Sequence, residues 1–152
     1  MSSPEGSSVV FRRVPATLPR APIQRFARTL QKEIAKGRPF AVLITGDAEL
    51  RRLNRQFRGL DVPTDVLSFP AEPLPGPSPS IGDIAISLAR ARAQARQFGH
   101  SLLQEIQILM LHGVLHLCGY DHETDSGAMA RAEKRCRAAL GLPTSLTERV
   151  RS

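Results

Sequence analysis

The chain has 152 residues, of which 41% are hydrophobic and 23% charged, a balance typical of one globular domain with a single core. This composition excludes a chain that is disordered throughout, and no apolar run reaches the ~18 residues that a membrane-spanning helix needs. The net charge of +7 suits a polyanion such as nucleic acid, although a basic enzyme without such a partner has the same charge.

The first part of the chain predicts two pairs of a strand followed by a helix. A flexible polar leader at residues 1–8 precedes a short strand at 9–13, where β-branched and aromatic residues cluster. Apolar residues at three- and four-residue steps predict a helix within 19–37. An apolar strand at 40–45 is followed by a helix over 47–58, which its first residue, an aspartate, is expected to cap. The buried face of that helix is expected to comprise Leu50, Leu53 and Phe57.

A proline-rich segment separates two further strands, expected at 65–69 and 81–87. The segment 70–80 contains five prolines, which lack an amide hydrogen. It is therefore expected to be an exposed loop that neither pairs in a sheet nor forms a helix. Ser87 is expected to cap an arginine-rich helix that ends near Gly99.

Two more helices are expected in the last third of the chain. Ser101 and Gln104 form a capping-box pattern at the start of a helix that is apolar almost all round, so it should be the buried central helix. A final helix is expected over about 125–140. The order β-α-β-α-β-β-α-α-α predicts an α+β fold, with a small mixed sheet of about four strands packed on helices. One domain is expected over residues 9–145, followed by a tail at 146–152.

Three of the four histidines lie within eleven residues, in the segment HGVLHLCGYDH. His112 and His116 are four residues apart on the predicted helix, so their side chains share one face. Gly119 ends that helix, which allows His122 to approach from outside it. A single buried histidine is usually a core residue, but three imidazoles that converge on one ion leave a position for water, as in catalytic zinc sites. We therefore predict one zinc bound by His112, His116 and His122, although another transition metal also suits three imidazoles.

The spacing H-x-x-x-H-x-x-G-x-x-H is also that of metzincin proteases, so the metal helix is expected to be zincin-like. In those enzymes a glutamate after the first histidine is the general base. Gly113 occupies that position here and accepts no proton, which argues against peptide hydrolysis. Asp121 is interpreted equally as an acceptor for a ligand imidazole or as a turn residue. Cys118 is expected to pack as a reduced thiol, which indicates a cytoplasmic protein.

Two separated motifs resemble those of one known family. HGVLHLCGYDH, and LNRQFRGLDVPTDVLSFP over residues 53–70, together resemble the YbeY family of bacterial endoribonucleases. The family's Gly-Asp pair is matched by Gly82 and Asp83, and the resemblance covers roughly residues 47–140. The chain departs from the family in having Phe57 where Tyr is usual and Leu60 where Lys is usual, and the loss of that lysine puts RNA affinity at this edge in doubt.

The resemblance implies a small α+β domain with the metal helix at its centre, and zinc-dependent cutting of single-stranded RNA. It also implies a role in 3′-end maturation of 16S ribosomal RNA and in ribosome quality control, with ribosomal RNA and ribosomal particles as partners and no membrane. The family's metal ligands fall on His112, His116 and His122. Its functional arginine falls on Arg58, which is expected to contact the scissile phosphate; a solvated charge at a helix end is the alternative.

The remaining polar residues leave alternatives open. Asp83 is interpreted as a turn residue rather than a proton acceptor, and His100 as a surface loop residue. Asp65 is expected to cap or turn the chain. Six other arginines are interpreted equally as a basic rim for RNA or as solvated helix faces: Arg51, Arg52, Arg55, Arg90, Arg92 and Arg96. The alternative to an endoribonuclease is a non-catalytic RNA-binding ribosome assembly factor with a structural metal.

Overall fold

The computed structural model of the protein describes residues 6–71, 80–120 and 127–143. Nine elements follow one another in these residues, in the order expected from the sequence. They are β1 (Ser8–Phe11), α1 (Arg20–Glu33), β2 (Ala41–Thr45), α2 (Asp47–Arg58), β3 (Val66–Pro70), β4 (Gly82–Ser87), α3 (Leu88–Phe98), α4 (Leu102–Leu117) and α5 (Ala128–Ala139). None of these helices is both long enough and apolar enough to cross a membrane.

The four strands form one mixed sheet in the order β1-β2-β4-β3. β1, β2 and β4 are parallel, whereas β3 lies at the edge and runs antiparallel to β4. Pro70 pairs with Gly82 at the end of β3, so the expectation that this proline lies in an unpaired loop is wrong. An edge strand tolerates proline because its ring nitrogen needs no hydrogen-bonding partner on the outer side. Residues 72–79 of the proline-rich segment lie outside the described residues.

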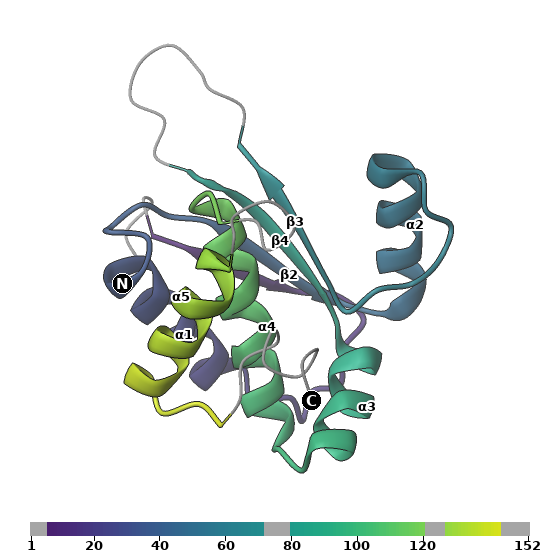
Figure 1. Cartoon of the computed structure of the whole chain (residues 1–152). Helices are drawn as coiled ribbons and strands as arrows, with labels where there is room; N and C mark the ends of the chain where they lie inside the picture. Colours follow the sequence, from purple (N-terminus) through teal and green to yellow (C-terminus); the bar gives the residue numbers. More distant parts are fainter. Residues whose placement is uncertain (1–5, 72–79, 121–126, 144–152) are drawn as a thin grey trace.

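Helices cover the two faces of the sheet unequally. α1, α4 and α5 lie on one face, and α2 lies on the other (Figure 1). Side chains that alternate along β4 serve the two layers: Ile84 and Ile86 join the main core with α4, whereas Ala85 joins a smaller cluster below α2. The mixed α+β architecture expected from the sequence is therefore confirmed.

α4 is the central helix of the main core, as expected from its apolar composition. Eleven of its sixteen residues are buried. Its first turn is held by the expected capping box, in which Ser101 Oγ accepts from the Gln104 amide and Gln104 Oε1 accepts from the Ser101 amide. Because both hydrogen bonds of the box are formed, local contacts stabilise the start of α4.

Two glycines permit α4 to lie close to the sheet. A Cβ atom on Gly113 would meet the side chain of Ile84 at 2.9–3.1 Å. At Gly82, with φ of +141°, a Cβ atom would lie 2.8 Å from the Leu117 side chain and closer still to the Phe69 carbonyl. Because neither glycine has a Cβ atom, α4 packs closely on β4, and the Leu117 side chain in its last turn lies at the end of the β3–β4 hairpin.

Several boundaries differ from those expected. β1 begins at Ser8, and Ser7 already contacts the fold, since its amide donates to Gln31 and its hydroxyl accepts from the Phe40 amide. These two residues of the expected leader thus belong to the folded part. Asp47 does not cap α2 with its side chain; it accepts instead from Ser87 Oγ at 2.8 Å and from Arg90 Nε at 3.2 Å.

Candidate functional site

Two histidines of α4 direct their ring nitrogens at each other. Nε2 of His112 and Nε2 of His116 lie 3.1 Å apart, and the rings meet nearly edge-on at 75°. Two nitrogens bound to one zinc ion at about 2.0–2.1 Å in tetrahedral geometry are about 3.3 Å apart. The two rings, which we call the imidazole pair, therefore already have nearly the separation that a shared ion requires.

A buried carboxylate holds one member of the imidazole pair from behind. Oε2 of Glu133, on α5, lies 2.8 Å from Nδ1 of His112, and both residues are buried. When Nδ1 carries the proton that this carboxylate accepts, Nε2 keeps its lone pair for an ion.

Glu133 was not among the site residues expected from the sequence, although a local signal for it existed. It falls on the buried stripe of α5 with Met129 and Ala132. A carboxylate rarely enters such a stripe unless it has a polar partner there.

The structure describes two of the three expected ligands. His112 is buried, whereas His116 is half-buried, so the pair reaches solvent on the side of His116. His122 and Asp121 lie outside the described residues. Accordingly, no group of three or more His, Cys, Asp or Glu side chains suited to a metal occurs in the parts of the chain that the structure describes.

Arg58 is exposed in the last turn of α2. Other arginines of this helix are occupied by carboxylates: Arg51 Nε lies 2.9 Å from Asp61, and Arg52 Nε lies 3.0 Å from Glu49. The neighbouring Arg51 guanidinium lowers the pKa of the Asp61 carboxyl. Arg58 forms no ion pair with any residue that the structure describes, so its guanidinium is not neutralised by them.

Arg58 and the imidazole pair lie on opposite faces of the sheet but at the same end of it. The ring of Phe57, next to Arg58, lies against Phe69 near the end of β3. Leu117, next to His116, approaches Gly82 at the start of β4. Since Pro70 pairs with Gly82, α2 and α4 both terminate near the end of the hairpin that these two residues form (Figure 1).

Comparison with known proteins now decides the family. The family model described as endoribonuclease YbeY matches residues 16–141. The chain belongs to the YbeY family. The endoribonuclease YbeY of Solibacter usitatus is 70% identical to it over 152 residues, which are 100% of both chains. That of Nautilia profundicola is 50% identical over 108 residues, which cover 71% of this chain and 76% of the relative.

A solved structure agrees with this assignment at the level of the fold. A Thermotoga maritima protein known from its solution structure matches with a TM-score of 0.58 and 27% identity, covering 85% of this chain and 84% of its own. Since the curated YbeY relatives are named endoribonucleases, the family is one of enzymes. The resemblance expected from the two motifs is confirmed.

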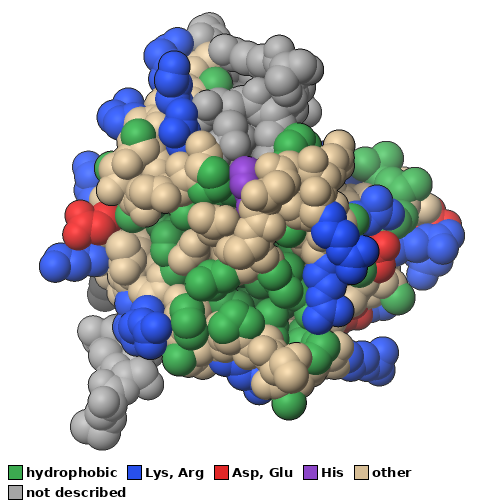
Figure 2. Space-filling model, turned by 90° about the horizontal axis from the view of Figure 1, so that it is seen from below, with side chains coloured by type: hydrophobic (Ala, Val, Ile, Leu, Met, Phe, Trp, Pro, Cys, Tyr) green, Lys and Arg blue, Asp and Glu red, His purple; other side chains and the backbone are tan. Residues whose placement is uncertain are grey.

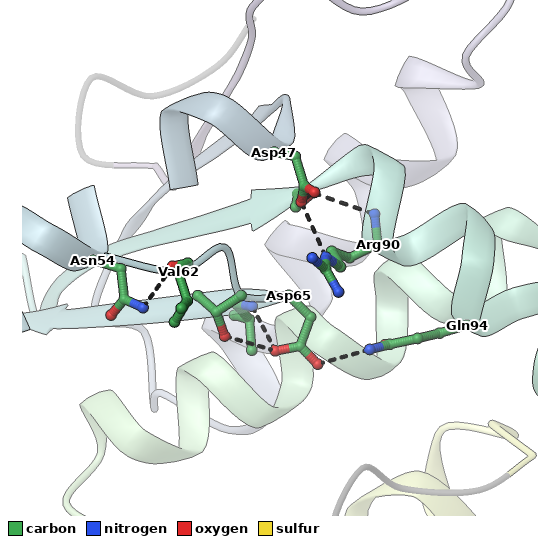
Figure 3. A network of polar contacts seen from close by, with 9 residues as sticks. Asp47, Asn54, Val62, Asp65, Arg90 and Gln94 are labelled. Carbon is green, nitrogen blue, oxygen red and sulfur yellow. Dashed lines mark hydrogen bonds and ion pairs between the residues drawn. The ribbon is translucent and has the colours of Figure 1, made fainter. Parts of the chain in front are cut away.

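In this member of the YbeY family, Asp65 of the PTDVLSF segment has a structural role. Its carboxylate accepts from the Val66 amide at 2.8 Å, from Thr64 Oγ1 at 3.4 Å and from Gln94 Nε2 at 3.2 Å (Figure 3). These bonds tie the start of β3 to α3. Asp65 lies at a bend directly before β3, as expected of a residue that turns the chain.

The six arginines that were expected to form either a basic rim for RNA or solvated helix faces differ in whether a carboxylate pairs with them. Arg51, Arg52 and Arg90 are paired with carboxylates. On the face shown in Figure 2, Lys and Arg side chains lie around the margin, and hydrophobic side chains gather toward the middle.

Three other expectations are settled by position. Asp83 lies within β4, opposite Phe69, so its expected role in a turn is wrong. His100 lies in the loop between α3 and α4, as expected, although it is half-buried beside the ring of Phe98. Cys118 is a free thiol packed against the main core, as expected, and burial raises its pKa.

Proposed function

We propose that this protein is a zinc-dependent endoribonuclease that cuts single-stranded RNA, with the metal held by His112, His116 and His122. The observation that carries the proposal is the imidazole pair, whose Nε2 atoms lie 3.1 Å apart on a helix of an endoribonuclease family. Nitrogen donors at this separation suit zinc and leave room for a third imidazole. Membership of the family supplies the substrate class, and the net charge of +7 is consistent with it.

The surroundings of the pair suit a catalytic ion better than a sealed one. When bound, zinc activates water and polarises a phosphate oxygen. Glu133 keeps the proton on Nδ1 of His112, so Nε2 faces the ion as a neutral donor. Burial of His112 and Glu133 excludes water from their side of the pair, and the half-buried His116 leaves an approach from solvent. A zincin-like metal helix is therefore part of the proposal.

Arg58 is proposed to bind the scissile phosphate. Its guanidinium presents parallel N–H donors that match two phosphate oxygens, and it is not engaged by a described carboxylate. The developing negative charge of the phosphate needs such a cation. Because Arg58 and the imidazole pair flank the end of the β3–β4 hairpin from opposite faces, the long Arg58 side chain has to reach around the edge strand β3 to contact the scissile phosphate.

Peptide hydrolysis is disfavoured by the packing of Gly113. A side chain at this position would point into Ile84 of the sheet, where its Cβ atom alone comes within 2.9–3.1 Å. A glutamate base therefore has no room in the position that metzincins use.

The proposed cellular role rests on membership of the YbeY family. The protein is proposed to act on the 3′ end of 16S ribosomal RNA and on defective ribosomes, with ribosomal particles as partners, in the cytoplasm. Two motifs within residues 53–122 and the family model over 16–141 support this assignment. The single domain expected over residues 9–145, extended at its start by Ser7 and Ser8, is proposed to carry the activity.

Metal content and RNA cleavage test the proposal together. The wild-type protein is expected to contain about one zinc per chain and to cut a single-stranded RNA that spans the 16S 3′ end. A chelator should stop cleavage, and added zinc should restore it. His116→Ala should lose both metal and cleavage, whereas His100→Ala removes an imidazole elsewhere and should keep both.

Purification of His116→Ala by the same procedure controls for a contaminating nuclease. Zinc-free protein or His116→Ala that cuts as fast as the wild type would overturn the catalytic assignment. Tight, salt-sensitive RNA binding without cleavage under any metal would identify an RNA-binding assembly factor with a structural metal instead.

A further inference from the structure

Exposed hydrophobic side chains concentrate at the end of α2 that carries Arg58. Five large hydrophobic residues are exposed among those the structure describes, and three of them, Phe57, Leu60 and Val62, fall within six positions. Phe57 is the most exposed, at 58%. Single exposed hydrophobics are ordinary, but a phenyl ring beside a proposed phosphate contact is placed where a ligand can cover it.

The ring of Phe57 contacts the ring of Phe69. Its ring centroid lies 5.1 Å from that of Phe69, with the planes inclined at 58°. Phe69 in turn packs against the smaller apolar cluster between α2 and the sheet, formed by Leu50, Leu67 and Ala85. The ring is thus anchored to the core through Phe69, while more than half of Phe57 is open to solvent. Aromatic rings presented in this way are the platforms on which single-stranded nucleic acids stack their bases.

The charged groups near the Phe57 ring suit different parts of an RNA strand. Arg58 follows Phe57 and offers a guanidinium to phosphate. Asp83 is the cross-strand partner of Phe69, so its exposed carboxylate lies on the same face of the sheet. A carboxylate repels phosphate but accepts hydrogen bonds from the amino groups of bases. The polarity of the surface therefore suits a base over the sheet and a phosphate at the helix end.

We propose that Phe57 stacks on one unpaired base of the RNA, while Arg58 binds the adjacent phosphate. This rests on the proposed function and extends it by naming the feature of the substrate that the surface recognises. A base inside a duplex has both faces covered by its neighbours, whereas a base in a single strand can be splayed onto an aromatic ring. Phe57 thus contributes to the selection of single strands.

RNA fits this surface better than a protein partner does. A stable protein interface buries about 800 Å² on each side. Here the apolar side chains are interrupted by Arg58 and by Asp61, whose carboxylate is already bound to Arg51. A single base is matched in size to a single ring. The net charge of +7 also favours a polyanion.

Fluorescence anisotropy in the presence of a chelator tests the stacking without cleavage. The probes are a labelled single-stranded RNA, the same strand with abasic sites, and the corresponding duplex. Phe57→Ala should weaken binding of the intact single strand about five- to hundredfold, as expected for the loss of one stacked base. Phe57→Tyr keeps the ring and should bind within about twofold of the wild type. Phe98→Ala removes an exposed ring elsewhere and serves as the matched control.

The abasic strand separates stacking from phosphate binding. Wild type and Phe57→Ala should bind it equally weakly, because no base is there to stack. An equal loss on intact and abasic strands, or no loss on either, would overturn the proposal. Unchanged RNA affinity combined with lost self-association or lost binding to ribosomal particles would assign the ring to a protein interface. Failure of the wild type with zinc to cut RNA would refute the proposed nuclease activity but not the stacking, because the anisotropy measurement needs no cleavage.

Discussion

Oε2 of Glu133 lies 2.8 Å from Nδ1 of His112, across the interface between α5 and α4. The carboxylate is fully buried, and the imidazole is nearly so. A buried carboxylate that accepts from Nδ1–H fixes both the tautomer and the orientation of the ring. Glu133 is therefore a positioning residue for Nε2 of His112.

Removing this carboxylate should weaken metal binding. Glu133→Ala is expected to lower zinc affinity about 10–100-fold, and Glu133→Gln, which keeps an acceptor oxygen, should lose less. Competition with a chromophoric chelator measures the affinity. NMR of the His112 ring in metal-free protein should show a loss of the Nδ1–H tautomer in Glu133→Ala. Unchanged affinity and tautomer, with only a lower melting temperature, would leave Glu133 a purely structural role.

Arg58→Ala should slow cleavage more than it weakens binding. Losing a charged hydrogen-bonding partner of the transition state costs about 1.5–3 kcal/mol, or roughly ten- to hundredfold in kcat/KM. Arg51→Ala is the matched control, because Arg51 is on the same helix but is engaged by Asp61. Single-turnover cleavage, measured beside RNA affinity, separates the two effects. Equal losses in Arg58→Ala and Arg51→Ala would indicate a general charge effect.

Gly113→Ala should destabilise the protein even though alanine favours helices. Helix propensity gains up to about 1 kcal/mol, but a Cβ atom 2.9–3.1 Å from the buried Ile84 side chain overpacks the interface, at about 1–3 kcal/mol. Urea unfolding of Gly113→Ala, Ile84→Ala and the double variant tests this. The double variant should be less destabilised than the sum of the two. Strict additivity would show that the two side chains do not compete for space.

Acid should remove a small stabilisation at Glu49. A hydrogen bond from Arg52 is the main cause that lowers the pKa of this carboxyl, and Arg12 adds to it. Because the folded-state pKa is lowered, the stabilisation is present at neutral pH and is lost as the pH falls through that pKa. Glu49→Gln should therefore cost about 0.2–1 kcal/mol at pH 7 and nothing in strong acid.

Local patterns predicted the elements well because they depend on neighbours in the chain. The apolar stripe of α1, the capping box at Ser101 and the spacing of His112 and His116 all act within a few residues. The imidazole pair follows from helical geometry alone, since side chains four residues apart share a face.

Features that depend on distant segments were not predictable in this way. Phe57 continues the apolar stripe of α2, yet it is exposed because it lies beyond the small cluster formed with the edge strand. Asp47 looked like a cap, but Ser87 and Arg90 bind its side chain. Glu133 meets His112 only because α5 folds back on α4. Such contacts join residues far apart in the chain, and local periodicity carries no information about them.

The order of the elements has a consequence for biogenesis. All four strands and α1 to α3 end by Phe98, whereas His112, His116 and Glu133 follow on α4 and α5. Because the inner face of the sheet packs on α4, the sheet gains its main core only after the segment that carries His112 and His116 has been made. The imidazole pair thus forms together with this core, so the ion proposed to bind there would meet a folded scaffold rather than a nascent chain.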